Sequence, residues 1–305
     1  MLTLPMVTAL KSINPSAKIS IIASGYIRKL LECYPQIDNL FFIEDFSDGI
    51  DDIFKEIKFD AVFFPRPKPH EAKASARAGI PLRVGSLYRL YSFYYNHRVG
   101  DHRKKGEYHE AEYNCRQISS VIGDDVLTKM IAPTINENML ASLSKKFETK
   151  EKYLIIHPGS GGSAYDWSAE RFGKAAKEIA QKYSMIPVVT GVSSEQELCN
   201  LAANECSKTV NLCGMLDLEE MIALISKASL FISNSTGVLH IAASIDVPVI
   251  GLYPNTSHIS ARRWGPYSKN RQVVSPPDKI NPKEMDDMSK IEVKDVLMAA
   301  ERLLV

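Results

Sequence analysis

The chain has 305 residues, of which 45% are hydrophobic and 24% are charged, and its formal net charge is +1. A chain of this length is too long to fold around one small core, which favours two domains of ordinary size. The near-neutral net charge gives no reason to expect a nucleic-acid partner. The five cysteines form no CxxC pair, so reduced thiols are expected and neither a metal nor a cofactor is predicted. No apolar run has the length of a membrane span and no signal peptide is recognisable, which predicts a cytoplasmic protein.

Short apolar runs alternate with amphipathic stretches along the chain. Strands are predicted at 18–24, 39–45, 60–64 and 81–85 in the first half, and at 153–159, 186–191, 209–214, 228–233 and 247–253 in the second. Helices are predicted at 70–79, 168–183, 194–204, 217–227 and 237–245. Alternating strands and helices are typical of parallel sheets that are covered on both faces.

Residues 124–150 break this alternation, because they are polar and mixed in character. A boundary near 145–151 divides the chain into domains of residues 1–148 and 149–305. Two doubly wound domains are predicted, and such sheets bind ligands outside the carboxyl ends of their strands.

The segment FISNSTGVLHIAAS (231–244) runs from an apolar strand through a polar turn into a predicted helix. Amides in the first turn of a helix lack intrahelical acceptors, and the helix dipole makes that end positive. Ser235, Thr236 and Gly237 are small enough to let a phosphate approach those amides. The turn alone fits this interpretation and simple helix capping equally well. His240 by itself would more often be a packed histidine than a ligand contact.

A second loop, HPGSGGSAYDW (157–167), follows the first predicted strand of the same domain. Its backbone at Ser160, Gly161 and Gly162 carries little side-chain bulk and can form an anion-binding nest. The loop matches neither the P-loop nor the GxGxxG pattern. Because both loops follow strands of one predicted sheet, together they predict a ligand that contains a diphosphate.

Two further segments are expected at the carboxyl edge of the same predicted sheet. Glu195 could accept hydrogen bonds from a ribose diol, or it could be a solvated carboxylate in the first turn of a helix. Met215 and Leu216 could form an apolar wall for a base, or they could be ordinary core residues.

Together these segments resemble glycosyltransferase family 9, the ADP-heptose:lipopolysaccharide heptosyltransferases. The matching stretches are IIHPGSGGSAYDWSAERF, PVVTGVSSEQEL, SNSTGVLHIAAS, VPVIGLYP and RRWGP, with TLPMVTALKSINP, ARAGIPLRVGS and HEAEYNCRQI in the N-terminal half. The resemblance implies a GT-B fold, in which two Rossmann-like domains face a central cleft and the last helix packs back on the first domain. It also implies an inverting transferase that moves a heptose-like sugar from a nucleotide-diphosphate donor, with ADP-heptose expected, to a lipopolysaccharide core acceptor.

Site roles follow from the same resemblance. The donor diphosphate is expected at the Ser235–Gly237 turn with His240 close by, the ribose at Glu195, and the adenine near Met215 and Leu216. Family members often have Asp where Ser235 stands, so donor preference can differ.

The glycine loop also departs from the family, because many members have a basic residue at the position of Tyr165. No lysine or arginine lies between Lys152 and Arg171. Positive charge near the donor phosphates must then come from elsewhere, with Arg262 and Arg263 as candidates.

Two alternatives stay open. A serine hydrolase with Ser235 as nucleophile is conceivable, because SNSTG lies on a predicted strand–turn–helix, although a nucleophile elbow needs glycine at the position of Ser233. The other alternative is a nucleotide-sugar-binding pseudoenzyme that has lost catalysis.

Family chains begin with a strand and a Gly-Asp loop, followed by a helix that reads like LTLPMVTALKSINP, and Met1 falls inside this pattern. The first strand and the aspartate expected as general base would therefore lie upstream of Met1, and the neighbouring strands would have unpaired edges. No catalytic residue is assigned. The 305-residue form is expected to bind nucleotide but to transfer sugar weakly or not at all.

Residues 61–106 hold ten Lys or Arg but only two acidic residues. This local excess in a near-neutral chain predicts an anionic partner. An acidic lipopolysaccharide core at the inner face of the cytoplasmic membrane fits, with a peripheral membrane contact, whereas a solvated loop without a specific role is the alternative. Arg66 and Lys68 follow the carboxyl end of a predicted strand and are the candidates for acceptor binding.

Overall fold

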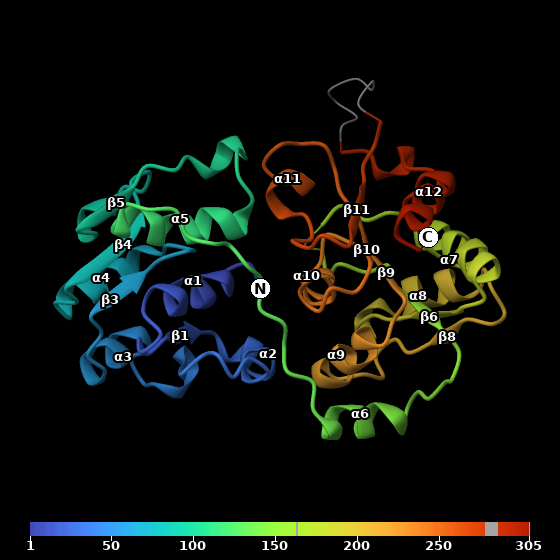
Figure 1. Cartoon of the computed structure of the whole chain (residues 1–305), viewed down its shortest axis with the longest axis horizontal. Coiled ribbons are helices and arrows are strands. Elements are labelled where there is room, and N and C mark those ends of the chain that lie inside the picture. The colour runs from blue at the N-terminus through green and yellow to red at the C-terminus, as the bar shows by residue number, and fades with distance from the viewer. Residues whose placement is uncertain (163, 278–285, 305) are drawn as a thin grey trace. The chain divides into compact units, whose positions relative to one another are not determined.

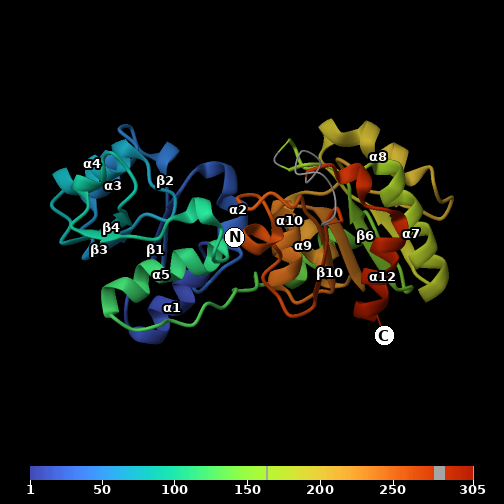
Figure 2. The ribbon, with the colours of Figure 1, turned by 90° about the horizontal axis from the view of Figure 1, so that it is seen from above.

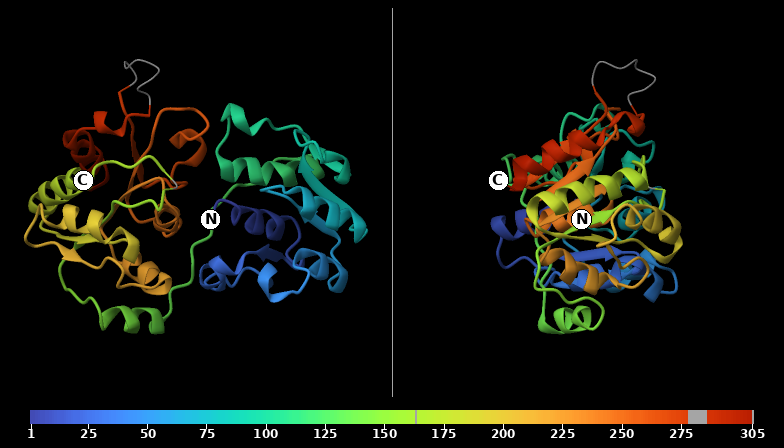
Figure 3. Two further views of the ribbon diagram at one scale, coloured as in Figure 1. Left: turned by 180° about the vertical axis from the view of Figure 1, so that it is seen from behind. Right: turned by 90° about the vertical axis from the view of Figure 1, so that its right-hand side faces the viewer.

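The computed structural model describes residues 1–162, 164–277 and 286–304. The chain forms two compact units: Leu2–Ile131, here called the N-terminal unit, and Ala132–Val305 with Met1, here called the C-terminal unit. This division falls earlier in the chain than the boundary near 145–151 that the sequence suggests. The reason is α6 (Glu137–Ser144), which packs against α9 (Leu218–Ser226) in the C-terminal unit (Figures 1 and 3).

The C-terminal unit is built on one parallel six-stranded sheet with the order β8–β7–β6–β9–β10–β11. The strands are β6 (Tyr153–His157), β7 (Ile186–Val189), β8 (Val210–Asn211), β9 (Leu230–Asn234), β10 (Val249–Leu252) and β11 (Arg271–Val274). Counted from β6, this is the 3-2-1-4-5-6 order of a Rossmann fold. The winding of the chain reverses between β6 and β9, and the carboxyl ends of strands at such a switch point are where open α/β sheets bind ligands.

Helices cover both faces of this sheet. One face carries α7 (Ala169–Tyr183), α8 (Gln196–Ala203) and α12 (Val293–Leu304), and the other carries α9 and α10 (Gly237–Ser244) (Figure 2). A single helical turn, α11 (Ala261–Trp264), precedes β11. Because both faces are covered, Leu230, Phe231 and Ile232 of β9 are fully buried.

The last helix packs within the C-terminal unit. The contact with the first domain that the family resemblance implies stays a prediction. In the structure, Val296, Ala299 and Ala300 of α12 join the same core cluster as Phe172 of α7, and α12 packs along α7 and β11. The buried face of α12 therefore completes the C-terminal unit.

The N-terminal unit contains two short parallel sheets. One pairs β1 (Ser20–Ala23) with β2 (Asn39–Phe42), and the other has β3 (Ala61–Phe63), β4 (Leu82–Ser86) and β5 (His97–Val99) in that order. Among the described residues, β1 and β3 each pair with a strand on one edge only. Ile22 of β1 and Val62 of β3 nevertheless pack against one apolar cluster, so the two sheets share a core.

The helices of this unit lie on both sides of the strands. α1 (Pro5–Ile13) packs on α5 (Glu110–Ile122), and α3 (Ile50–Glu56) packs on α4 (Pro69–Arg77) on the opposite side (Figure 2). A short α2 (Arg28–Glu32) lies between β1 and β2 in the chain. In the described part of the protein, no helix has the length and apolar character needed to cross a membrane.

Candidate functional site

The two loops singled out in the sequence meet at the switch point of the C-terminal sheet. β6 and β9 are hydrogen-bonded neighbours, and His157 at the end of β6 is in register with Ser233 of β9. The chain continues from β6 into the glycine loop and from β9 into the polar turn that begins α10. Parallel pairing therefore places both loops at one edge, as the sequence predicts.

Asn234 joins these two loops. It is fully buried, and its Nδ2 donates to the carbonyl of Pro158 at 2.8 Å and to Oδ1 of Asp166 at 3.2 Å. Its Oδ1 accepts from the backbone N–H of Trp167 at 3.1 Å. Neither Asn234 nor Asp166 is among the candidates predicted from the sequence. The signal for Asn234 was its place within the polar cluster that follows an apolar strand.

Glu195 holds the glycine loop from the other side. It is buried, and its two carboxylate oxygens accept from the backbone N–H groups of Gly161 and Val192, both at 3.0 Å. A Cβ at Gly159 would lie 2.2 Å from the Glu195 carboxyl group, so only glycine permits this approach. The interpretation of Glu195 as a solvated carboxylate is therefore wrong.

The loop itself leaves backbone exposed to an incoming group. Gly161 and Gly162 have φ of +56° and +75°, which favours glycine. A Cβ at either position would meet nothing within 4 Å, so the space beside these residues is open.

The start of α10 combines a cap with an open approach. Thr236 is the N-cap residue, and its Oγ1 accepts from the N–H of Leu239 at 3.4 Å and lies 3.0 Å from Oγ of Ser233. The capping interpretation thus holds for Thr236. The amides of Gly237 and Val238 come earlier in the first turn, where helices lack internal acceptors, and a Cβ at Gly237 would meet no atom within 4 Å.

Ser235 is hydrogen-bonded to the hydroxyl of Tyr253. The Tyr253 hydroxyl donates its one proton to the carbonyl of Trp264 at 2.8 Å, so it accepts from Ser235. Burial raises the pKa of Tyr253, which keeps this phenol neutral. A neutral phenol is not the base that activates a nucleophilic serine. His240 lies buried in the first turn of α10.

The edge carries carboxylates and a neutral imidazole. Burial lowers the pKa of His157 to about 4, with Glu195 opposing, and its Nδ1 lies 3.0 Å from Oγ1 of Thr190. Burial raises the pKa of Asp166, the Ser160 hydroxyl opposes this shift, and the charge of Glu195 adds to it. Since these groups supply no positive charge, an anion here would depend on amides, hydroxyls and the α10 dipole.

The remaining candidates of this unit occupy nearby turns. Met215 is 49% exposed and Leu216 is half-buried in the turn after β8, so neither is an ordinary core residue. The N–H of Gly214 donates to the carbonyl of Gly191 at 2.9 Å, which brings this turn against the chain that leaves β7. Arg262 and Arg263 lie in α11, and the Arg263 guanidinium lies 4.8 Å from the Trp264 ring centroid.

The proposed acceptor residues belong to the N-terminal unit. Arg66 and Lys68 are exposed in the loop that follows β3, and Lys68 pairs with Glu71 at 3.0 Å.

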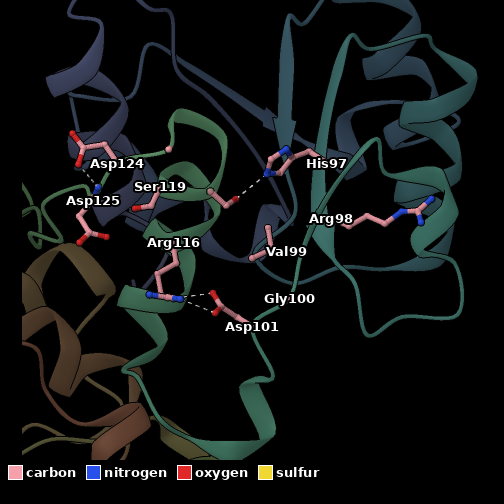
Figure 4. Close-up of a pocket in the computed structure, with 11 residues that line it drawn as sticks. His97, Arg98, Val99, Gly100, Asp101, Arg116, Ser119, Asp124 and Asp125 are labelled. Atoms are coloured by element: carbon pink, nitrogen blue, oxygen red, sulfur yellow. Dashed lines mark hydrogen bonds and ion pairs between the residues drawn. The ribbon is translucent and has the colours of Figure 1, made fainter.

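A separate pocket of about 710 Å³ lies between β5 and α5 of the N-terminal unit (Figure 4). Arg116 donates to both oxygens of Asp101 at 2.9 and 3.0 Å, and Nε2 of His97 lies 3.0 Å from Oγ of Ser120. These groups satisfy one another, and the lining includes neither Arg66 nor Lys68.

A Rossmann-ordered sheet with two amide- and hydroxyl-rich loops at its switch point is typical of domains that bind a nucleotide diphosphate. The glycosyltransferase family 9 (heptosyltransferase) domain matches residues 71–292, and the chain belongs to this family.

Individual relatives agree with the family. The chain is 24% identical over 332 residues to lipopolysaccharide heptosyltransferase 3 of Escherichia coli strain K12, covering 100% of this chain and 94% of the relative. It superposes on the glycosyl transferase family 9 structure from Veillonella parvula with a TM-score of 0.84, 19% identity and coverage of 99% of this chain and 92% of the other. For E. coli heptosyltransferase WaaC with ADP the TM-score is 0.73, with 18% identity and coverage of 99% and 95%.

The structural likeness confirms the predicted GT-B fold of two Rossmann-like domains, and the family match confirms a glycosyltransferase. The serine hydrolase alternative has no support from the family or from the environment of Ser235.

Proposed function

We propose that the protein is an inverting heptosyltransferase that takes heptose from ADP-heptose and delivers it to a lipopolysaccharide core acceptor at the cytoplasmic face of the membrane. The observation that carries this proposal is the meeting of the glycine loop and the α10 N-terminus at the switch point, joined through Asn234. The similarity of the chain to lipopolysaccharide heptosyltransferase 3 and to a heptosyltransferase solved with ADP supports an ADP-linked donor and a lipopolysaccharide acceptor.

The donor diphosphate would bind the open amides of the two loops. The amides of Gly237 and Val238, with Ser235 and Thr236 beside them, face the same edge as Ser160 and the loop glycines. Negative charge grows on the diphosphate as the sugar leaves, so fixed N–H donors aimed at it stabilise the transition state. This protein would use amide dipoles, because the loop contains no lysine or arginine.

The nucleoside would occupy the neighbouring turns. The Glu195 oxygens each keep a lone pair after accepting an amide, so the carboxylate can also accept from a ribose hydroxyl. The exposed Met215 and the half-buried Leu216 offer apolar surface to an adenine. His240 would lie close to the diphosphate, in the first turn of α10.

The acceptor would be held by basic side chains of the N-terminal unit. Arg66 and Lys68 follow the carboxyl end of β3, where ligands of such sheets bind. Inversion requires deprotonation of the attacking hydroxyl by a base, for which the family resemblance expects an aspartate. Replacing Arg66 and Lys68 by alanine should weaken acceptor binding and flatten its salt dependence, and unchanged binding would remove them from the site.

The first experiment is a thermal-shift panel of ADP, UDP, GDP and CMP. ADP at 100 times its dissociation constant should add about 2.7 kcal/mol to the unfolding free energy, with smaller shifts for the other nucleotides. A preference for another nucleotide, or no shift with any, would contradict the proposed donor.

Transfer is then measured with ADP-heptose and a core oligosaccharide, and NMR of the product gives the anomeric configuration. Nucleotide binding without transfer would leave the pseudoenzyme alternative.

A further inference from the structure

The connection between β4 and β5 exposes large apolar side chains. Four residues of this apolar loop, defined here as Leu87–Phe93, are well exposed in the described structure: Leu87 (45%), Tyr88 (53%), Leu90 (100%) and Phe93 (64%). Single exposed apolar residues are ordinary, but several in one short loop mark an interaction surface.

The base of the apolar loop is fixed in place. The Tyr91 hydroxyl donates to the carbonyl of Pro67 at 2.8 Å. Tyr95 is 1% exposed, and its ring centroid lies 5.2 Å from that of Phe64. A Cβ at Gly85 would lie 2.3 Å from the Tyr95 ring, so this glycine allows the close packing. The exposed side chains therefore project from an anchored loop.

Two neighbouring segments that carry basic residues contact the apolar loop or each other. Besides the Tyr91–Pro67 hydrogen bond, the Tyr88 and His102 ring centroids are 4.6 Å apart, and Arg103 Nη1 donates to the carbonyl of Pro65 at 3.1 Å. These contacts hold the segments around Pro65 and Arg103 beside the apolar loop. The exposed basic residues of the three segments are Arg66, Lys68, Arg89, Lys104 and Lys105.

We propose that this surface docks on an anionic phospholipid bilayer. Leu90 and Phe93 enter the boundary between headgroups and acyl chains, Tyr88 lies at headgroup depth, and Arg89 and Lys104 bind lipid phosphates. Charge complementarity selects this occupant, because apolar side chains beside Lys and Arg are typical of interfacial membrane anchors. Two copies of the chain meeting at this surface would bring like charges together.

The test is co-sedimentation with vesicles of phosphatidylcholine and phosphatidylglycerol in equal parts, and with vesicles of phosphatidylcholine alone. The wild-type chain should bind the anionic vesicles and lose affinity as salt is raised. The double variant L90S/F93S should bind them at least about tenfold more weakly, because its insertion area is lost. The double variant R89E/K104E should bind about tenfold more weakly and lose the salt dependence.

Matched controls come from the same unit. Leu127→Ser removes an exposed leucine (71%) outside the loop, and Lys58→Glu reverses an exposed charge away from it. Both should bind as the wild type does.

Absence of wild-type binding, equal binding to the neutral vesicles, or wild-type binding by L90S/F93S would each overturn the proposal. Self-association of the protein that L90S/F93S abolishes would assign the surface to a second copy and overturn it too. The inference uses no donor-site residue, and ADP binding measured on the same samples separates its failure from that of the proposed function.

Discussion

The two units present their functional groups in opposite ways. At the edge of the C-terminal sheet, Asn234 is fully buried and makes three hydrogen bonds, whereas Leu90 in the N-terminal unit is fully exposed. A small polar ligand can be recognised by backbone amides that a buried network holds in position. A large partner needs side chains that project from the surface. We therefore expect small substitutions at the C-terminal edge to lower the unfolding free energy, and substitutions in the exposed N-terminal surface to leave it nearly unchanged.

The largest effect is expected for Asn234→Ala. The change leaves the carbonyl of Pro158 and the N–H of Trp167 without their buried partner, which should lower the unfolding free energy by about 3 kcal/mol. Chemical denaturation measures this loss. Asn270→Ala removes an exposed amide and should cost less than about 0.5 kcal/mol; equal losses in the two variants would refute the structural role of Asn234.

Gly159→Ala should come next. Its Cβ would overlap the Glu195 carboxyl group, at a cost of about 2 kcal/mol in unfolding free energy and with weaker ADP binding. Glu195→Ala removes the clash, so the double variant G159A/E195A should lose less than the sum of the single variants. Gly100→Ala is the control, because a Cβ there meets nothing within 4 Å. Strict additivity would show that Glu195 does not hold the loop.

Gly237→Val should act on binding more than on stability. Its side chain would enter the open space beside the first amides of α10, and ADP affinity should fall about tenfold, or about 1.4 kcal/mol. Isothermal titration measures the affinity, and Gly237→Ala should give a smaller loss. Unchanged affinity in the folded Val variant would remove the α10 N-terminus from the donor site.

The smallest effect concerns pH and the link between α6 and α9. Burial would raise the pKa of Glu220, but Lys146 at 2.6 Å, the Asp217 amide and the Ser142 hydroxyl lower it to about 2. A carboxyl whose folded pKa is lowered stabilises the fold above its unfolded pKa, and here that stabilisation is lost as the pH falls from about 4.5 through about 2.

Glu220→Gln should flatten this part of the stability curve and cost about 1 kcal/mol at pH 7, because Lys146 is 37% exposed and stays solvated. Glu219→Gln, on the same helix, is the control. An unchanged pH profile in the Gln variant would show that the pair does not stabilise the unit.

Local sequence was sufficient for most of the fold. Continuous apolar runs predicted the strands that became β6, β7, β9 and β10, because central parallel strands are buried on both faces. The edge strands β5 and β11 were missed, since His97–Val99 and Arg271–Val274 are short and carry polar residues. The amphipathic pattern of the last helix requires a partner but does not specify which, so its place on α7 and β11 needed the structure.

The candidate site divides in the same way. Glycines and hydroxyl residues predicted the two loops, because backbone access is a local property. The bonds of Asn234 and Glu195 depend on pairing between strands far apart in the chain. Sequence also could not separate the exposed Leu90 from the buried Tyr95, although both lie in one aromatic and basic segment.

The hydrogen bond from Asn234 to Pro158 spans 76 positions of the chain. A growing polypeptide that has been synthesised through β8 already contains every glycine of the first loop, yet its central strand has no partner on the β9 side. Closing so long a loop costs entropy before any contact compensates, and non-local pairing of this kind slows folding. Nucleotide binding, measured on chains that end at successively later residues, would therefore show at which length β9 pairs with β6 during synthesis.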